Sequence, residues 1–408
     1  MPRIAPLALA CTIGAACATS RVGEGGAPGT PAASRAADGG AFVVRMGVDT
    51  IAVERFERAG DVYLGEYALR SPTARLFRTR IELTPAGDVL RATRAEHRVG
   101  APADAPPLSR VETTVRGDSA TLVETRGDSV VSTRRAPAAP GALPGMPESN
   151  LSFELVATRA AAAGRDTLQV PLLLPAGPRI RAARIGPDSM TFTIGLNTTF
   201  RARIDPAGHI LGLHGTGSTI QVRLTREAAT AVDVPAIAAR WARAQPMGVL
   251  SPADSVKATV DGAAVAIHYG RPSKRGRVVF GDSGVAMEPW GKVWRTGANE
   301  ATRLTTDRDL VIGDAVVPAG TYTLWTLLDR AGWRLIVNRQ TLRADGSGRP
   351  LWGTGYDPRH DLARTAMTMT RLTEPVEQLS IALEPQGRAA VLRVRWDTTE
   401  ATVPVRAR

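Results

Sequence analysis

The sequence predicts an all-β protein built from two β-rich domains joined by a short helix. Short runs of alternating apolar and polar residues, separated by turn residues, extend from residue 41 to about residue 226, which is the pattern of half-buried strands. The composition then changes: six of the seven Trp lie beyond residue 249 and indicate a second core. The 408 residues, 43% hydrophobic and 22% charged, suffice for two globular domains.

The N-terminal domain is predicted to span residues 41–232 as an antiparallel barrel or half-barrel with one helix. Arg-Gly-Asp-Ser at 116–119 and again at 126–129 indicates strand reversals in a three-stranded meander. A helix is predicted over 150–163, where Gly164 stops it. The other strands are expected at 41–48, 50–58, 61–69, 76–84, 89–99, 167–174, 178–185, 189–195, 198–205, 208–214 and 218–225. This order of elements resembles the incomplete β-barrels of periplasmic lipoprotein and lipid carriers. The resemblance implies an apolar cavity, and a filled barrel or sandwich is the alternative.

The N-terminus has the pattern of an export signal. Residues 1–16 contain one cation and then an apolar stretch too short to span a membrane, and they are predicted to be a signal peptide. Gly14-Ala15-Ala16 before Cys17 resembles a bacterial lipoprotein box, which implies cleavage before Cys17 and its lipidation. An ordinary signal cut after Ala16 is the alternative. Residues 17–40, rich in Gly, Pro and Ala, are a predicted flexible tether. We therefore expect a cell-envelope location, periplasmic or outer-membrane-associated, with the membrane as partner through the anchor.

Charge and cysteine content exclude several functions. The net charge of +12 comes from 51 Lys and Arg against 39 Asp and Glu. The excess is spread along the chain, whereas nucleic-acid binding predicts a basic stripe or tail, so no nucleic-acid partner is expected. A general basic field still favours anionic ligands or membrane surfaces. The two cysteines, Cys11 and Cys17, both lie in the leader region, which leaves the later chain without a thiol nucleophile or thiolate metal ligand.

Residues 233–249 are predicted to be a helical linker, with Asp233 as helix cap, before a β-sandwich domain over 250–408. The strongest pattern in that domain is the run Trp-Arg-Thr-Gly-Ala-Asn-Glu-Ala-Thr at 294–302. With the flanking segments 251–281, 316–341, 352–367, 374–379 and 392–405, it resembles the bacterial domain-of-unknown-function family 2911 over about residues 250–405. The resemblance implies an exported all-β domain and carries no established activity.

Strand assignments in this domain follow from the same alternation. Val265, Ile267 and Tyr269 share one strand face, and residues 321–328 and 333–338 flank a turn as a hairpin. Residues 392–396 and 401–405 are expected to form a closing strand pair.

Two polar clusters are candidate binding elements for a small anionic ligand. The first cluster is the turn of residues 271–277, which has four cations in seven residues. Its Arg side chains can clamp a carboxylate or phosphate. In the alternative, the turn is a solvated loop in which one Arg pairs with a neighbouring carboxylate of the protein. The second cluster is residues 295–300, which contain a Gly-Ala-Asn turn. This turn can build a polar pocket, or it can be fixed by a salt bridge between Arg295 and Glu300. Because both flank residues 280–294, we expect one site. Its candidate residues are His268, Arg271, Lys274, Arg277, Arg295, Asn299 and Glu300.

Catalytic, cofactor and metal motifs are not recognisable. Gly281-Asp282-Ser283-Gly284 lacks the further Gly and the triad partners that a serine-protease nucleophile loop requires. No pair of His has metal-ligand spacing, and no phosphate or dinucleotide fingerprint occurs. His268 is the one candidate acid–base residue. We expect a non-enzymatic binding or structural protein; the alternatives are a lipid or lipoprotein carrier and a hydrolase of envelope substrates using Glu300 and His268.

Overall fold

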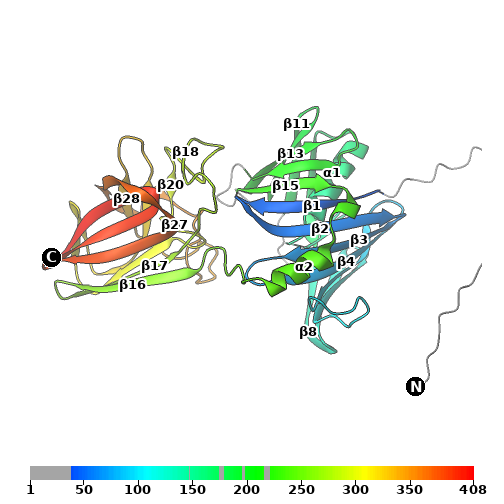
Figure 1. The fold of residues 1–408 in the computed structure, drawn as a ribbon, viewed down its shortest axis with the longest axis horizontal. Coiled ribbons are helices and arrows are strands. Elements are labelled where there is room, and N and C mark those ends of the chain that lie inside the picture. Colours follow the sequence, from blue (N-terminus) through cyan, green and yellow to red (C-terminus); the bar gives the residue numbers. More distant parts are fainter. Residues whose placement is uncertain (1–37, 147, 174–178, 195–197, 216–220) are drawn as a thin grey trace, which may run out of the picture. The chain divides into compact units, whose positions relative to one another are not determined.

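The computed structural model describes residues 38–146, 148–173, 179–194, 198–215 and 221–408. The predicted signal peptide, Cys17 and almost all of the predicted tether lie outside the described residues. The described chain is mostly β strand, as predicted (Figure 1). It has two α-helices, α1 (Leu151–Ala162) and α2 (Val234–Arg243), and two 3-10 turns, η1 (Ala229–Ala231) and η2 (Pro358–His360).

The strands up to Glu227 form one 15-stranded sheet. They are β1 (Asp38–Met46), β2 (Asp49–Ala59), β3 (Val62–Leu69), β4 (Arg75–Leu83), β5 (Val89–His97), β6 (Ser109–Arg116), β7 (Ser119–Arg126), β8 (Ser129–Pro137), β9 (Leu143–Pro144), β10 (Thr167–Leu173), β11 (Arg179–Gly186), β12 (Ser189–Ile194), β13 (Thr198–Ile204), β14 (Ile210–His214) and β15 (Val222–Glu227). The runs β1–β8 and β10–β15 are meanders that meet where β1 pairs with β15. Among the described strands, β8 and β9 are separate edges, so a closed barrel is wrong and the sheet is open. The short β9, which pairs parallel to β10, was not predicted.

The two helices pack on opposite faces of this sheet. On β1, Phe42 and Val44 belong to the hydrophobic cluster around α1, whereas Ala41 and Val43 belong to the cluster around α2. Side chains on a strand alternate between faces, which explains why each strand supplies both clusters. α2 begins as predicted, with the Asp233 side chain accepting a hydrogen bond from Ala236 N at 3.0 Å.

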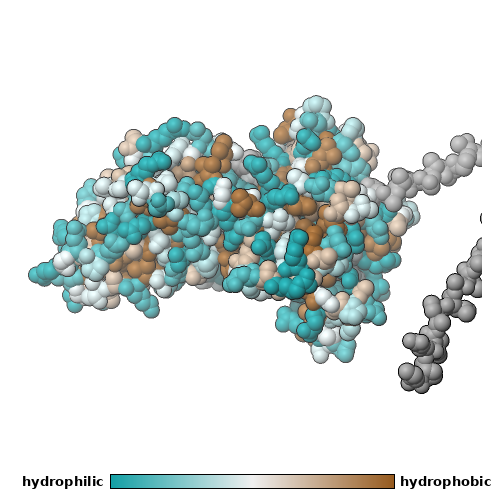
Figure 2. Space-filling view, in the orientation of Figure 1, coloured by the Kyte–Doolittle hydropathy of each residue, from teal (hydrophilic) through white to brown (hydrophobic). Residues whose placement is uncertain are grey.

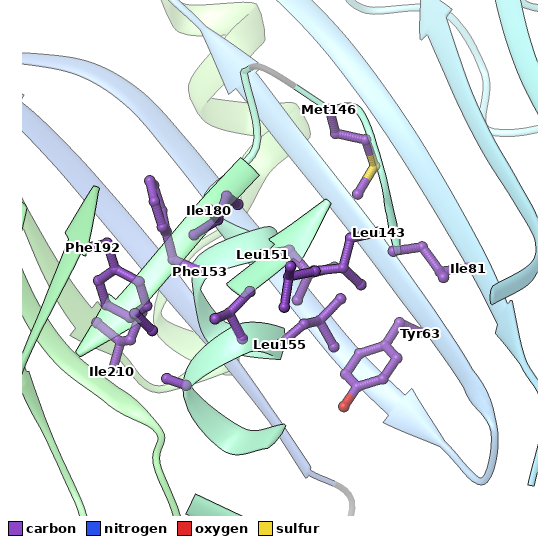
Figure 3. Close-up of a cluster of buried hydrophobic side chains, with 14 of the residues drawn as sticks. Tyr63, Ile81, Leu143, Met146, Leu151, Phe153, Leu155, Ile180, Phe192 and Ile210 are labelled. Atoms are coloured by element: carbon purple, nitrogen blue, oxygen red, sulfur yellow. The ribbon is translucent and has the colours of Figure 1, made fainter. Parts of the chain in front are cut away.

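Helix α1 fills the space beside the sheet that a carrier would leave open. Leu151, Phe153 and Leu155 are buried between residues of both meanders (Figure 3). Polar groups hold both ends of the helix. Near its start, Glu54 of β2 accepts hydrogen bonds from the Ser149 hydroxyl and from Asn150 N; near its end, Arg159 donates to the carbonyls of Gly141 and Gly87.

The strands after residue 250 form separate sheets around their own core. They are β16 (Ala253–Val260), β17 (Ala263–Gly270), β18 (Phe280–Gly281), β19 (Glu288–Pro289), β20 (Val293–Trp294), β21 (Thr302–Thr306), β22 (Leu310–Ile312), β23 (Ala315–Val317), β24 (Gly320–Leu327), β25 (Arg334–Asn338), β26 (Asp361–Ala366), β27 (Thr368–Gln386) and β28 (Ala389–Ala407). A seven-stranded sheet has the order β16-β17-β21-β24-β25-β26, with β20 beside β24, and a four-stranded sheet has the order β23-β22-β28-β27. Both sheets contribute to one core, as a sandwich requires.

The expected closing strand pair is wrong. Residues 392–396 and 401–405 belong to one long strand, β28, which pairs with β27. Asp397 stands between them with φ 52°, and the pairing register with β27 shifts there. The chain therefore bends at an irregularity and continues, whereas a hairpin would reverse it.

Candidate functional site

A row of polar side chains crosses the outer face of the seven-stranded sheet, the face turned away from the main core. Val265, Ile267 and Tyr269 share one face of β17, as predicted, and that face packs into the core, whereas His268 lies on the other face. His268 is opposite Arg303 of β21, and Arg303 is opposite Thr323 of β24. Because cross-strand neighbours have Cβ atoms about 5 Å apart, the register brings an imidazole, a guanidinium and a hydroxyl side by side.

A pocket of about 540 Å³ includes this row in its lining, and this volume is within the range of small-molecule sites. Three of the seven candidate residues line it: His268, Asn299 and Glu300. Its other lining residues are Ala253, Asp254, Tyr269, Gly270, Ala298, Ala301, Arg303, Thr323, Thr341, Pro350, Leu351 and Trp352. The structure therefore brings His268 of β17 together with Asn299 and Glu300 of the Gly-Ala-Asn turn.

The turn at one side of the pocket is held in an unusual backbone conformation. Thr296 and Asn299 have φ values of 51° and 63°, which non-glycine residues rarely adopt. The Thr296 carbonyl accepts a hydrogen bond from the Thr302 hydroxyl at 2.9 Å, and Trp294 Nε1 donates to the Gly297 carbonyl at 3.1 Å. These buried contacts fix the direction in which Asn299 and Glu300 leave the sheet.

A second loop, around residues 350–353, lies beside this turn and also lines the pocket. Glu300 and Trp352 form an isolated antiparallel backbone bridge, and Ala301 N donates to the Leu351 carbonyl at 2.9 Å. Beneath them lies a small buried cluster of Ala301, Trp325, Ile336 and Leu351. The apolar contacts of this cluster anchor both loops to the outer face of the sheet, which gives the pocket rigid walls.

Several side chains in the pocket are not engaged by the protein itself. Among the described residues, the Glu300 carboxylate, the Arg303 guanidinium and the His268 imidazole form neither an ion pair nor a side-chain hydrogen bond with one another or with any neighbour. Trp352 is 41% exposed, and the Arg343 guanidinium carbon lies 5.5 Å from the centre of its ring. The pocket thus presents a cation, an anion, an imidazole and an aromatic ring to a ligand.

The cationic turn is held by contacts within the protein. Arg271 donates from Nη1 to Asp254 Oδ2 at 3.0 Å and from Nε to the Leu379 carbonyl at 3.0 Å. Lys274 Nζ lies 2.5 Å from Asp397 Oδ1. Neither residue lines the pocket, although Asp254, the partner of Arg271, does. Arg271 and Lys274 therefore attach the turn to β16 and β28. This is the alternative interpretation of the first cluster, in which a cation pairs with a carboxylate of the protein.

The remaining two candidates, Arg277 and Arg295, converge on a buried carboxyl group instead. Burial raises the pKa of Glu288 to about 8, against the opposing effects of Arg295 and Arg277. Burial likewise lowers the pKa of Arg277 to about 10, and it lowers the pKa of the Arg295 guanidinium. Arg295 Nη1 also donates to the Asn299 carbonyl at 3.2 Å. Arg295 thus supports the Gly-Ala-Asn turn from within the protein.

The sequence interpretation missed two pocket residues, Arg303 and Trp352. Arg303 lies between Thr302 and Leu304, whose side chains face inward, so its own side chain faces outward. This outward position directly after the Gly-Ala-Asn turn was the available signal that Arg303 belongs to the site. Trp352 had no comparable signal, because a Trp in a loop gives no indication of its exposure. The described part of the chain contains no cluster of three or more His, Cys, Asp or Glu that could hold a metal ion.

The fold and pocket define the C-terminal region as a β-sandwich with a small polar site on the outer face of one sheet. Residues 251–405 match the family described as protein of unknown function (DUF2911), which confirms the resemblance found in the sequence. No curated protein matches the chain. The resemblance of the N-terminal region to periplasmic carriers stays a prediction. No helix of the described residues is long and apolar enough to cross a membrane.

Proposed function

We propose that the protein is an exported, lipid-anchored envelope protein whose C-terminal region binds a small polar or anionic ligand without transforming it. The observation that supports binding is the set of polar side chains in the pocket, Glu300, Arg303 and His268, that have no partner among the described residues. Charged groups exposed together in a shaped pocket and unused by the fold are available to a ligand. The carrier alternative needs an apolar cavity, whereas α1 occupies the apolar face of the N-terminal sheet.

Native mass spectrometry of the gently purified mature protein tests ligand binding. The test variant combines Glu300→Gln with Arg303→Gln. The matched control is Arg334→Gln, an exposed arginine of the same sheet outside the pocket. A discrete added mass on the wild type and the control, absent from the folded test variant, supports the proposal. A clean protein mass in all three contradicts it. A ligand recovered intact only from His268→Ala favours the hydrolase alternative instead.

Export and anchoring rest on the leader sequence and need their own test. Replacing Cys17 with Ser should move the protein from the membrane to the soluble fraction, because the lipid has no other attachment point in a lipoprotein box. Cys11→Ser is the matched control, since Cys11 lies inside the predicted signal peptide. Unchanged fractionation of Cys17→Ser would count against the anchor and leave the pocket proposal intact.

A further inference from the structure

Trp352 gives the pocket a flat apolar surface with a defined orientation. The backbone bridge to Glu300 holds its position along the loop, and Arg343 packs over its ring. Trp352 lines the pocket whereas Arg343 does not. Ring atoms at the pocket wall can therefore contact a ligand while the guanidinium restrains the indole by a cation–π contact. This large aromatic side chain is 41% exposed and lies in the same pocket as the unengaged charges.

The polar groups around this ring define what a ligand must carry. Arg303 offers several N–H donors in a planar fork, which fits a carboxylate. Glu300 only accepts hydrogen bonds when ionised, so it requires a donor such as a hydroxyl. Asn299 donates from Nδ2 to the Ser251 carbonyl at 3.2 Å, and its side-chain oxygen is left to accept. One anionic group, several hydroxyls and an apolar face are therefore needed in a single small molecule.

We propose that the ligand is an acidic sugar, a pyranose that carries a carboxylate. This inference rests on the proposed function, because it names the ligand class of the same pocket. A pyranose ring has a face of C–H groups that packs on Trp352 and a rim of hydroxyls that reaches Glu300 and Asn299. Its carboxylate pairs with Arg303. A wholly apolar ligand would instead bury Arg303 and Glu300 without partners, and a simple dicarboxylate would leave the Trp352 ring uncovered.

Isothermal titration of the mature full-length protein with D-glucuronate and D-galacturonate tests the proposal. D-Glucose and succinate are the comparators, which lack the carboxylate and the ring, respectively. At least one uronate should bind about tenfold or more tightly than either comparator, because charge-assisted hydrogen bonds are the stronger ones. Arg303→Gln should reduce uronate affinity to that of glucose, and the matched control Arg334→Gln should leave it unchanged.

The aromatic contribution is tested by two substitutions at one position. Trp352→Ala should weaken uronate binding about tenfold or more, whereas Trp352→Phe, which keeps an aromatic face, should retain most of it. Thermal unfolding shows whether each variant is folded. Three results overturn the acidic-sugar proposal. Glucose binds as tightly as both uronates, succinate binds as tightly as both uronates, or the wild type binds neither uronate. If native mass spectrometry still finds a pocket-dependent ligand, the proposed function survives that result; if it finds none, both proposals fail.

Discussion

Gly353 lies directly against the side chain of Arg295. A Cβ atom at position 353 would stand 2.6 Å from Nη1 and 2.8 Å from Nε of Arg295, distances at which one of the two must move. Gly353 N also donates to the Asn299 carbonyl at 2.9 Å, so the Arg295–Gly353 contact joins the two loops that form the pocket walls.

Gly353→Ala should therefore destabilise the protein by about 1–3 kcal/mol, the usual cost of overpacking a closely packed position, and should weaken ligand retention. Urea unfolding measures the first effect and native mass spectrometry the second. Gly212→Ala is a suitable control, because a Cβ there meets only Leu224 O at 3.4 Å. A Gly353→Ala protein as stable as Gly212→Ala would show that Arg295 can move freely.

Arginines that hold the fold should differ from an arginine that is free for a ligand. Arg271→Gln removes bonds to Asp254 and Leu379 and should cost about 1–3 kcal/mol of unfolding free energy. Arg303→Gln has no such bond to lose and should change stability by less than about 0.5 kcal/mol. Chemical denaturation of the two variants in parallel measures the difference. Equal losses of stability would contradict the conclusion that Arg271 holds the fold whereas Arg303 is available to a ligand.

Glu54 should make the protein less stable as the pH rises. Burial raises the pKa of its carboxyl group from 4.5 to about 7. Between these values the unfolded chain releases a proton that the folded chain keeps, so unfolding becomes easier as the pH rises through this window. The effect amounts to about 3 kcal/mol once the pH exceeds the folded pKa.

Glu54→Gln removes this dependence, and its amide can still accept from Asn150 N and donate to the Ser149 hydroxyl. Relative to the wild type, the variant should therefore gain stability as the pH rises from about 4.5 to about 7, and the difference should level off above that. Denaturation at several pH values measures the difference, in which the contribution of Glu288 cancels because both proteins contain it. A difference that stays constant with pH would show that the Glu54 pKa is not raised.

The contributions of Glu154 and Arg226 to the free energy of unfolding should depend on each other. Glu154, 2% exposed on α1, accepts from Arg226 Nη1 at 2.6 Å and from Ile210 N at 2.8 Å, and His209 Nδ1 lies 3.0 Å from its Oε1. Glu154→Gln leaves a largely buried guanidinium without its counter-ion and should cost about 3 kcal/mol. Adding Arg226→Met should recover part of that loss, so a double-mutant cycle should give a clear coupling energy. Additive losses would mean that the pair contributes nothing specific.

Local patterns in the sequence predicted the elements well. The helix expected over 150–163 is found at Leu151–Ala162, and the twice-repeated Arg-Gly-Asp-Ser indeed marks the turns of a meander. These features depend on neighbouring residues, which one sequence displays directly. The strand β28 was misread because a bend at Asp397 resembles a turn in a pattern of alternating residues.

The site was predicted only in part because strand register is not visible in one sequence. His268 and Glu300 were named for their chemistry, and the structure brings them to one pocket. Arg303 was missed because only the pairing of β17 with β21 places it beside His268. Lys274 was included for its closeness in sequence to other cations, yet its partner is Asp397, 123 residues later. Contacts between strands that are distant in the sequence thus determine which polar residues are available to a ligand and which are paired within the protein.

The meeting of β1 and β15 at the middle of the large sheet also determines the order in which the sheet can be completed. Each meander is made of hairpins between successive strands, which form from short-range contacts. The β1–β15 pairing instead joins positions that are far apart in the sequence, such as Arg45 and Arg223. Until residues 222–227 have been synthesised, an emerging chain therefore carries β1 as an unpaired edge. Such edges promote association with other chains, so this side of β1 is open to pairing with another chain until the fifteenth strand covers it.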